Sequence, residues 1–255
     1  PWGQIAKPAG DGGRASVDCG ALQVNRSEEV ILSNPLMEYL PPAGQSQQPQ
    51  PQMHGAGKYY GPIATGYDAK RENDPKWIIE QKLITGMLDD LPPETIVFDC
   101  PVGTGRFLPF YIEKGFHFIG MDKSKDMLVE AGKKVQPFAG KAVGELHVGD
   151  VRETGINDKA VDVVVNCRIT RWLTPSDCQV MLKEMQRIAR QRIIWTARVA
   201  NHPHARTVEL FEEALDGWAI VRNEPGVDLD YRIIQARPID PMDELARINQ
   251  ELGLE

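Results

Sequence analysis

The stretch from Val97 to Phe107, VFDCPVGTGRF, decides the fold of this chain. An apolar run ends in an acid, Asp99, and a turn that contains Gly103 and Gly105 follows it. Glycine suits such a turn because it adopts backbone angles that other residues avoid, and because it lets a ligand approach the backbone closely. We expect a helix beyond the turn, whose N-terminal N–H groups favour negative charge. The stretch therefore predicts a buried strand, a ligand-binding turn and a helix.

Helical and extended segments alternate around this stretch. Apolar spacing predicts helices over Pro75 to Leu91, Arg106 to Lys114, Lys125 to Val135, Pro175 to Ala189 and Ala205 to Leu215. Apolar, often β-branched or aromatic, runs predict seven strands, at 96–98, 116–121, 145–148, 161–166, 192–196, 218–222 and 231–236. Strands separated by helices pair in parallel and are covered on both faces. The fold class is therefore α/β, with a doubly wound, mostly parallel seven-stranded sheet and an antiparallel C-terminal strand.

The composition divides the chain into an extension and one large domain. Residues 1–58 are rich in Gly, Pro and Gln, as in QSQQPQPQ at 45–52, and such a composition favours flexible chain. Within it, Glu29 to Leu40 is apolar enough to dock on the body of the protein or on a partner protein. We expect residues 1–58 to be a partly disordered extension, and residues 59–255 to form the domain.

Charge and hydropathy exclude several classes of protein. The net charge of −7 makes nucleic acid an unlikely partner, because proteins that grip phosphates usually carry a basic face. The sequence contains no apolar run of about 18 residues, which argues against a membrane partner. The four cysteines show no C-x-x-C spacing and indicate reduced thiols. We therefore expect a soluble, cytoplasmic protein.

Acids end two more of the predicted strands. Asp122 follows the second strand, where a carboxylate can hold both hydroxyls of a ribose. Met127 lies five residues further on, where its soft side chain could pack on an adenine ring. Asp150 ends the third strand, within reach of an amino group on a purine. Together with Asp99 and the glycine turn, these residues predict a nucleotide-like ligand at one edge of the sheet.

These motifs resemble those of the class I S-adenosylmethionine-dependent methyltransferases. Asp99 to Gly105 is similar to their first motif, Gly120 to Ser124 with Met127-Leu128 to their second, and Gly149 to Val151 to the motif after strand three. The resemblance covers roughly Tyr59 to Pro238 and implies a Rossmann-like methyltransferase fold with S-adenosylmethionine as cofactor.

The resemblance also implies a role for each cofactor-binding position. Gly103, Thr104 and Gly105 would face the methionine moiety, and Asp122 would hold the ribose. The adenine would be surrounded by Ser124, Met127, Asp150 and Val151, while Asp99 and Lys123 complete the set. Asn166 and Cys167, at the end of strand four, would lie beneath the sulfonium. The helix near Trp77, with Tyr59, Tyr60 and Tyr67 before it, resembles the lid of this family.

The glycine turn departs from the family pattern at one position. The first glycine of the usual D-x-G-x-G-x-G run is Pro101 here, and proline fixes φ and removes an N–H. Because the two later glycines remain, we expect the loop to survive. A nicotinamide cofactor is the alternative, but its fingerprint requires a third glycine where this chain has Leu108.

The loops after strands four and five are expected to receive the methyl acceptor. Arg168, Arg171 and Arg198 could clamp an anion such as a carboxylate or phosphate, and His202 is a candidate base. Tyr60, Tyr67 and Trp172 complete the candidate acceptor site. The sequence indicates no metal site, and the family requires no fixed catalytic residue.

We therefore expect methyl transfer to an O or N atom of a small, anionic acceptor. Two alternatives stay open. One is a protein or RNA methyltransferase that recruits its target through residues 1–58. The other is a non-catalytic binding module that keeps the methyltransferase fold.

Overall fold

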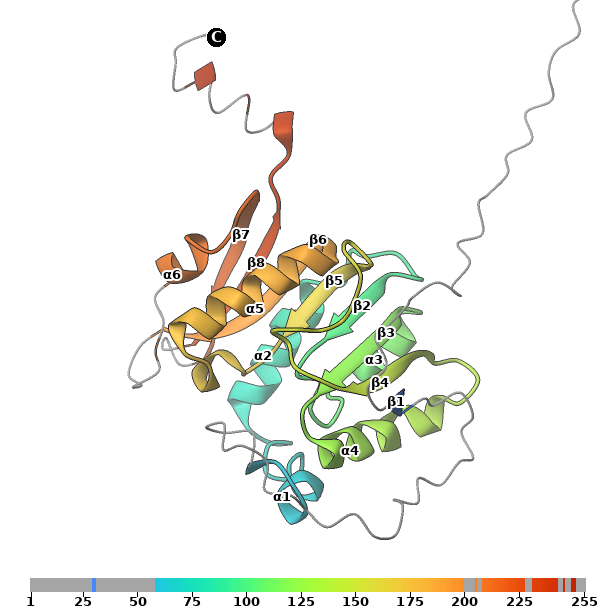
Figure 1. Cartoon of the computed structure of the whole chain (residues 1–255). Coiled ribbons are helices and arrows are strands. Elements are labelled where there is room, and N and C mark those ends of the chain that lie inside the picture. The colour runs from blue at the N-terminus through green and yellow to red at the C-terminus, as the bar shows by residue number, and fades with distance from the viewer. Residues whose placement is uncertain are drawn as a thin grey trace, which may run out of the picture.

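One central sheet organises the computed structural model of the chain, which describes residues 29–30, 58–199, 205, 208–227, 231–242, 245 and 249–250. Its strand order is β1-β4-β3-β2-β5-β6-β8-β7 (Figure 1). The strands are β1 (Glu29–Val30), β2 (Ile96–Asp99), β3 (His117–Asp122), β4 (Val143–Val148), β5 (Val161–Asn166), β6 (Ala189–Arg198), β7 (Trp218–Pro225) and β8 (Tyr231–Pro238).

Five strands at the centre of the sheet, β4, β3, β2, β5 and β6, pair in parallel. Strand β8 lies antiparallel to both of its neighbours, β6 and β7. The predicted seven-stranded, mostly parallel sheet with an antiparallel C-terminal strand is confirmed. The two-residue strand β1 was not predicted as a strand, and it pairs antiparallel with the edge strand β4. The rest of the apolar stretch Glu29 to Leu40 lies outside the described residues.

Helices cover both faces of the sheet. The helices are α1 (Pro62–Thr65), α2 (Pro75–Gly86), α3 (Leu108–Glu113), α4 (Lys125–Val135), α5 (Pro175–Ile188) and α6 (Val208–Glu212), with 3-10 turns η3 (Gln136–Phe138) and η4 (Thr170–Trp172). Buried residues of α2, α3 and α4 pack in one apolar cluster, and those of α5 and α6 pack in another on the opposite face. Figure 1 shows α5 along one face and α1 beside α4.

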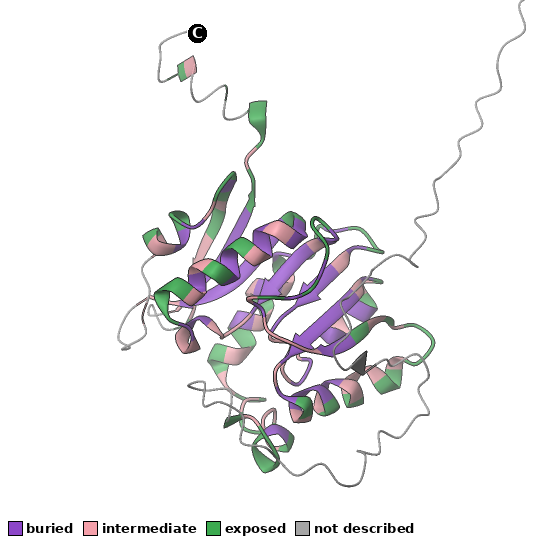
Figure 2. Cartoon of the chain, in the orientation of Figure 1, coloured by how far each residue is buried: buried purple, intermediate pink, exposed green. Residues whose placement is uncertain are grey.

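The alternation of side chains along β5 explains why two cores form. Val163 and Val165 belong to the cluster with α2, α3 and α4, whereas Val164 between them belongs to the cluster with α5. Successive side chains of a strand point to opposite faces, so a continuous apolar strand is buried on both sides. Figure 2 shows the sheet buried almost throughout and the outer faces of the helices exposed.

Element boundaries agree best with the sequence where local signals are strong. Strand β5 and helix α4 have the predicted bounds, and Ser124 caps α4 by accepting from the backbone N–H of Met127. Helix α2 ends at Gly86 rather than at Leu91. Strand β6 is longer than predicted, and α6 is shorter than the predicted helix. The added ends of β6 include Ala189 and Ala197, which are fully buried, so tertiary packing outweighs local propensity there.

A search for membrane spans found that no helix in the described part of the chain is long and apolar enough to cross a bilayer.

Helix α5 offers a test of how strongly its N-terminus is held. Thr174 is its N-cap and accepts a hydrogen bond from the backbone N–H of Asp177 at 3.1 Å. Replacing Thr174 by alanine leaves that N–H without its partner, and we expect a loss of about 1 kcal/mol in the free energy of unfolding. Thr174→Ser keeps the acceptor oxygen and is expected to retain most of the stability in urea denaturation. Equal losses in both variants would contradict the capping role.

Candidate functional site

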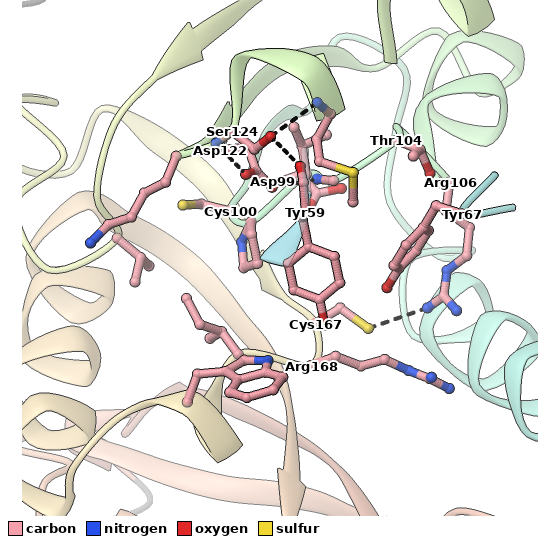
Figure 3. A pocket seen from close by; sticks show the side chains of 18 of the residues that line it. Tyr59, Tyr67, Asp99, Cys100, Thr104, Arg106, Asp122, Ser124, Cys167 and Arg168 are labelled. Atoms are coloured by element: carbon pink, nitrogen blue, oxygen red, sulfur yellow. Dashed lines mark hydrogen bonds between the residues drawn. The ribbon is translucent and has the colours of Figure 1, made fainter. Parts of the chain in front are cut away.

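A pocket lies at the carboxyl ends of the parallel strands. It encloses about 1130 Å³, its open mouth included, and the walls combine the ends of β2, β3, β4 and β5 with the segment before β2. In Figure 3, Asp99, Asp122 and Ser124 lie on one side of the view and Cys167 and Arg168 on the other, with Tyr59 drawn between them.

The carboxylate of Asp122 organises the loops around the pocket. Its two oxygens accept hydrogen bonds from the backbone N–H groups of Gly103 at 2.9 Å and Ser124 at 2.8 Å. Burial raises the pKa of Asp122 to about 6, although these backbone N–H groups and Lys123 act in the opposite direction. Each oxygen keeps a lone pair, so the carboxylate can accept further hydrogen bonds from ligand hydroxyls.

Asp99 is a buried acid with one oxygen unused. The hydroxyl of Tyr111 donates to Oδ2 at 3.2 Å, while Oδ1 has no hydrogen-bond partner among the described residues. Burial raises the pKa of Asp99 to about 7, because a desolvated carboxylate is disfavoured. An orphaned buried acceptor on a pocket wall marks a place for a ligand donor.

The Asp150 carboxylate forms ion pairs with two cationic side chains. Lys123 lies 2.8 Å and Arg152 2.6 Å from its Oδ2. Burial alone would raise its pKa, but the hydrogen bonds from Arg152 and Lys123 lower the pKa of Asp150 to about 2. Its carboxylate therefore stays ionised and shared between two cations.

The two glycines of the turn serve different purposes. Both have positive φ, +57° at Gly103 and +73° at Gly105. A Cβ on Gly103 would meet only Met127 Cε, at 3.7 Å, so this position faces open space in the pocket. A Cβ on Gly105 would come within 2.7 Å of Leu108 and 3.0 Å of Ala131. Gly105 therefore allows α3 and α4 to pack closely.

An aromatic cap formed by residues 58–74 and the start of α2 closes over the pocket. Tyr59 and Tyr67 meet edge to face at 5.6 Å, and Tyr67 meets Trp77 at 5.9 Å. The Ser124 hydroxyl donates to the Tyr59 carbonyl at 2.6 Å, and the Thr104 hydroxyl donates to Asp68 at 2.7 Å. The cap is therefore fastened to the same loops that line the cofactor side of the pocket.

A buried carboxylate on α2 joins three walls of the pocket. Glu80, 3% exposed, accepts from Arg106 at 2.7 Å and from Arg168 at 2.9 and 3.0 Å. The Cys167 thiol donates to it at 3.1 Å. Burial and the Glu80 charge raise the pKa of Cys167, so the thiol stays protonated. Arg106 retains one buried nitrogen, Nη1, without a partner among the described residues.

The backbone after β5 is held in a strained form. Arg168 has φ +65°, a left-handed conformation that is uncommon for a residue with a side chain. Its N–H donates to the buried Thr196 hydroxyl at 2.7 Å, and the Thr170 hydroxyl donates to the Thr196 carbonyl at 3.0 Å. These contacts fix the turn η4, which presents Arg171 and Trp172 to the pocket.

Most of the sequence-predicted site residues line this one pocket. From the cofactor set these are Asp99, Gly103, Thr104, Asp122, Lys123, Ser124, Met127, Asp150, Val151 and Cys167, and from the acceptor set Tyr67, Arg168, Arg171 and Trp172.

Four of the predicted residues that the structure describes lie outside the pocket lining. Gly105 packs against α3 and α4. Asn166 is fully buried and donates to the Cys100 carbonyl at 2.7 Å, so it joins two strand ends instead of facing a ligand. Tyr60 is 41% exposed, and Arg198 ends β6 outside the lining. His202 lies outside the described residues.

Sequence reasoning missed Glu80 and Arg106. Arg106 directly follows the glycine turn, so its position was a usable signal. Glu80 gives no such signal, because its partner Arg168 is 88 residues away. Among the described residues, no group of His, Cys, Asp and Glu could hold a metal ion.

Comparisons with known proteins agree with this geometry. The sequence model of a family described as a methyltransferase domain matches residues 97–192. A curated relative, the malonyl-[acyl-carrier protein] O-methyltransferase of Hamiltonella defensa subsp. Acyrthosiphon pisum (strain 5AT), is 27% identical over 142 residues. That match covers 54% of this chain and 49% of the relative, so the chain spans about half the length of the curated relative it matches.

Solved structures share the fold at low sequence identity. Magnesium protoporphyrin IX methyltransferase from Synechocystis PCC 6803, with bound SAH, has a TM-score of 0.60 and 16% identity, and the match covers 72% of this chain and 98% of that one. The 1,6-didemethyltoxoflavin-N1-methyltransferase of Burkholderia thailandensis has a TM-score of 0.57 and 15% identity, over 80% and 99% of the two chains.

The two turn glycines predict a matched pair of stability effects. Gly103→Ala and Gly105→Ala both place a side chain at positive φ, so both lose stability. Only Gly105→Ala also forces a Cβ against Leu108 and Ala131, and we expect it to lose about 1–3 kcal/mol more. Thermal and urea unfolding of both variants measures the difference. Equal losses would disprove the packing role of Gly105.

Because Asp99 is buried, we expect the free energy of unfolding to depend on pH. Because its folded pKa of about 7 lies above the unfolded value of about 4, the folded state gains protons relative to the unfolded one, and stability falls as pH rises between these values. Asp99→Asn removes this loss. In the absence of ligand, the variant should be more stable than the wild type at pH 8, by on the order of a few kcal/mol, and the difference should shrink towards pH 4. A difference that does not change with pH would refute it.

Proposed function

Because the chain belongs to the class I S-adenosylmethionine-dependent methyltransferases, we propose that it binds S-adenosylmethionine in this pocket and transfers the methyl group to an O or N atom of a small, anionic acceptor. The observation that carries the proposal is the meeting of three strand-end acids, Asp99, Asp122 and Asp150, with the glycine turn on one pocket wall.

The polar groups left over on the pocket wall fit the amino-acid end of the cofactor. Asp99 Oδ1 is a buried acceptor without a partner, and Arg106 Nη1 is a buried donor without one, among the described residues. An ammonium group would satisfy the first and a carboxylate the second. The Gly103 position between the strand end and α3 leaves space for the chain that connects them.

The nucleoside end fits the loops after β3 and β4. Asp122, already fixed by Gly103 and Ser124, would accept the two ribose hydroxyls. Met127 and Val151 offer apolar contact to the adenine ring, and Asp150 would accept from its amino group. Since Lys123 and Arg152 share Asp150, that last hydrogen bond should contribute less than those made by Asp122.

When bound, the cofactor supplies an activated methyl group on a sulfonium. Cys167 and the strand end of β5 would lie beneath it, and the chain's task is to hold the acceptor in line with the methyl group. Arg168 and Arg171 also line the pocket, on the segment after β5 that Thr196 holds in place. We therefore place the acceptor between this segment and the aromatic cap, where closure of the cap excludes water.

The three free cysteines of the described chain are consistent with a reducing compartment, and we propose that the protein works in the cytoplasm.

Asp122 gives the sharpest test of cofactor binding. Asp122→Ala removes a carboxylate that would accept two hydroxyls, so we expect affinity for S-adenosylmethionine to fall by about 1–3 kcal/mol, measured by calorimetric titration. In the wild type, binding should also weaken as pH falls from about 7 to below about 6, because Asp99 and then Asp122 take up protons there.

Glu130 lies on α4, pairs with Lys133 and does not line the pocket, so Glu130→Gln is a matched control that should bind like the wild type. Parallel titration with NAD should show no binding. Unchanged affinity in a folded Asp122→Ala protein would remove the ribose assignment, and tight binding of NAD instead would overturn the proposed cofactor.

A further inference from the structure

Positive charge exceeds negative charge on the acceptor side of the pocket. Three guanidinium groups line it, those of Arg106, Arg168 and Arg171. The Glu80 carboxylate forms ion pairs with Arg106 and Arg168. If the cofactor carboxylate binds Arg106, one excess positive charge remains on this wall. Buried or half-buried cations are usually paired, so the wall is built for one more anion.

Arg171 is the guanidinium with the fewest protein partners. Its Nη2 lies 3.4 Å from the Tyr59 hydroxyl, a long hydrogen bond, and its buried Nε has no partner among the described residues. Its guanidinium also lies 4.7 Å from the centre of the Trp172 ring. The fixed turn η4 therefore holds a donor-rich planar group at the pocket with hydrogen-bonding capacity to spare.

Two aromatic residues, Tyr59 and Trp172, contact this guanidinium. Tyr59 contacts both Tyr67 and Trp172 edge to face, at 5.6 and 6.4 Å between ring centres. All three rings line the pocket, together with Ile169 and Leu173. Such walls favour a flat or apolar body, with Arg171 binding an anionic group at its end.

The side chains beside the proposed position of the methyl group hold their protons or carry fixed positive charge. The Cys167 thiol and the Tyr67 hydroxyl have raised pKa values, in both cases chiefly because of burial. Arginine does not act as a base near neutral pH. A protonated amine would be repelled by the same guanidinium groups. An acceptor that is already an anion needs no base and is not repelled by the guanidinium groups.

Resting on the function proposed above, we propose that the acceptor is a small carboxylic acid with a flat or apolar body, methylated on its carboxylate oxygen, and that Arg171 selects it. The carboxylate oxygen supplies the electron pair of the new O–CH₃ bond. The S–CH₃ bond breaks, and its electron pair remains on sulfur, which becomes a neutral thioether. No proton is transferred, so the step requires no base, and Arg171 acts by orienting the carboxylate.

Binding of three matched probes tests the acceptor class. The full chain is first titrated with S-adenosylhomocysteine, and the loaded protein is then titrated with benzoate, benzamide and benzylamine. We expect benzoate to bind about tenfold or more tightly than benzamide, and benzylamine to bind least. With labelled S-adenosylmethionine and a panel of aryl and alkyl carboxylic acids, transferred label should be released by mild alkali, as from a methyl ester.

Variants separate Arg171 from a general charge effect. Arg171→Gln should weaken benzoate binding roughly 10- to 100-fold, to the level of benzamide, with little change in S-adenosylhomocysteine affinity. Arg171→Lys keeps the charge but loses the planar fork, so an intermediate affinity is expected. Arg222→Gln, on the exposed surface of β7, should bind both ligands like the wild type.

Each contrary result has a distinct meaning. Failure of the wild type to bind S-adenosylhomocysteine would overturn the proposed function itself. If the loaded protein binds benzamide or benzylamine as well as benzoate, or binds none of them, the carboxylate proposal is wrong. Benzoate binding that survives Arg171→Gln would likewise exclude Arg171 as the selecting residue.

Discussion

The buried Glu80 carboxylate is the contact on which the shape of the pocket depends. It lies on α2 and binds Arg106 after the glycine turn, Arg168 after β5, and the thiol of Cys167. A buried charge is tolerated only when it is paired, and removing one partner leaves the other uncompensated. Helix α2, the glycine turn and the segment after β5 are therefore held in one arrangement. Glu80 forms ion pairs with Arg106 and Arg168 but not with Arg171.

The acids at the sheet edge show a balance between stability and binding. Asp99 and Asp122 are buried, and burial raises the pKa values of both, to about 7 and about 6. An isolated folded chain gains nothing from placing two carboxylates there. A ligand that brings an ammonium group and hydroxyls supplies the missing partners. In the proposed function, the unfavourable burial of these acids would be relieved when the cofactor binds.

The sequence predicted the sheet and most of the cofactor side of the pocket because local signals mark them. The VDVVVN run of β5 and the Ser124 cap of α4 need no distant partner to be recognised. Side-chain direction was harder to predict. Asn166 ends a strand as expected, yet it turns inward to the Cys100 carbonyl. Gly105 also allows two helices to pack, a role that its place in the turn did not reveal. Glu80 became visible only when the fold brought Arg168, 88 residues away, beside it.

The hydrogen bonds that hold the aromatic cap also bear on how a bound cofactor would be released. Tyr59 and Asp68 are tied to Ser124 and Thr104, residues on the very loops that would grip the cofactor, and Gly61 is tied to Asp126 at 2.6 Å. In the proposed function, release of the spent cofactor would require these hydrogen bonds and the aromatic contact of Tyr67 with Trp77 to open. A local opening of residues 58–74 would then set the residence time of the product of the proposed reaction, at a distance from the transferred methyl group.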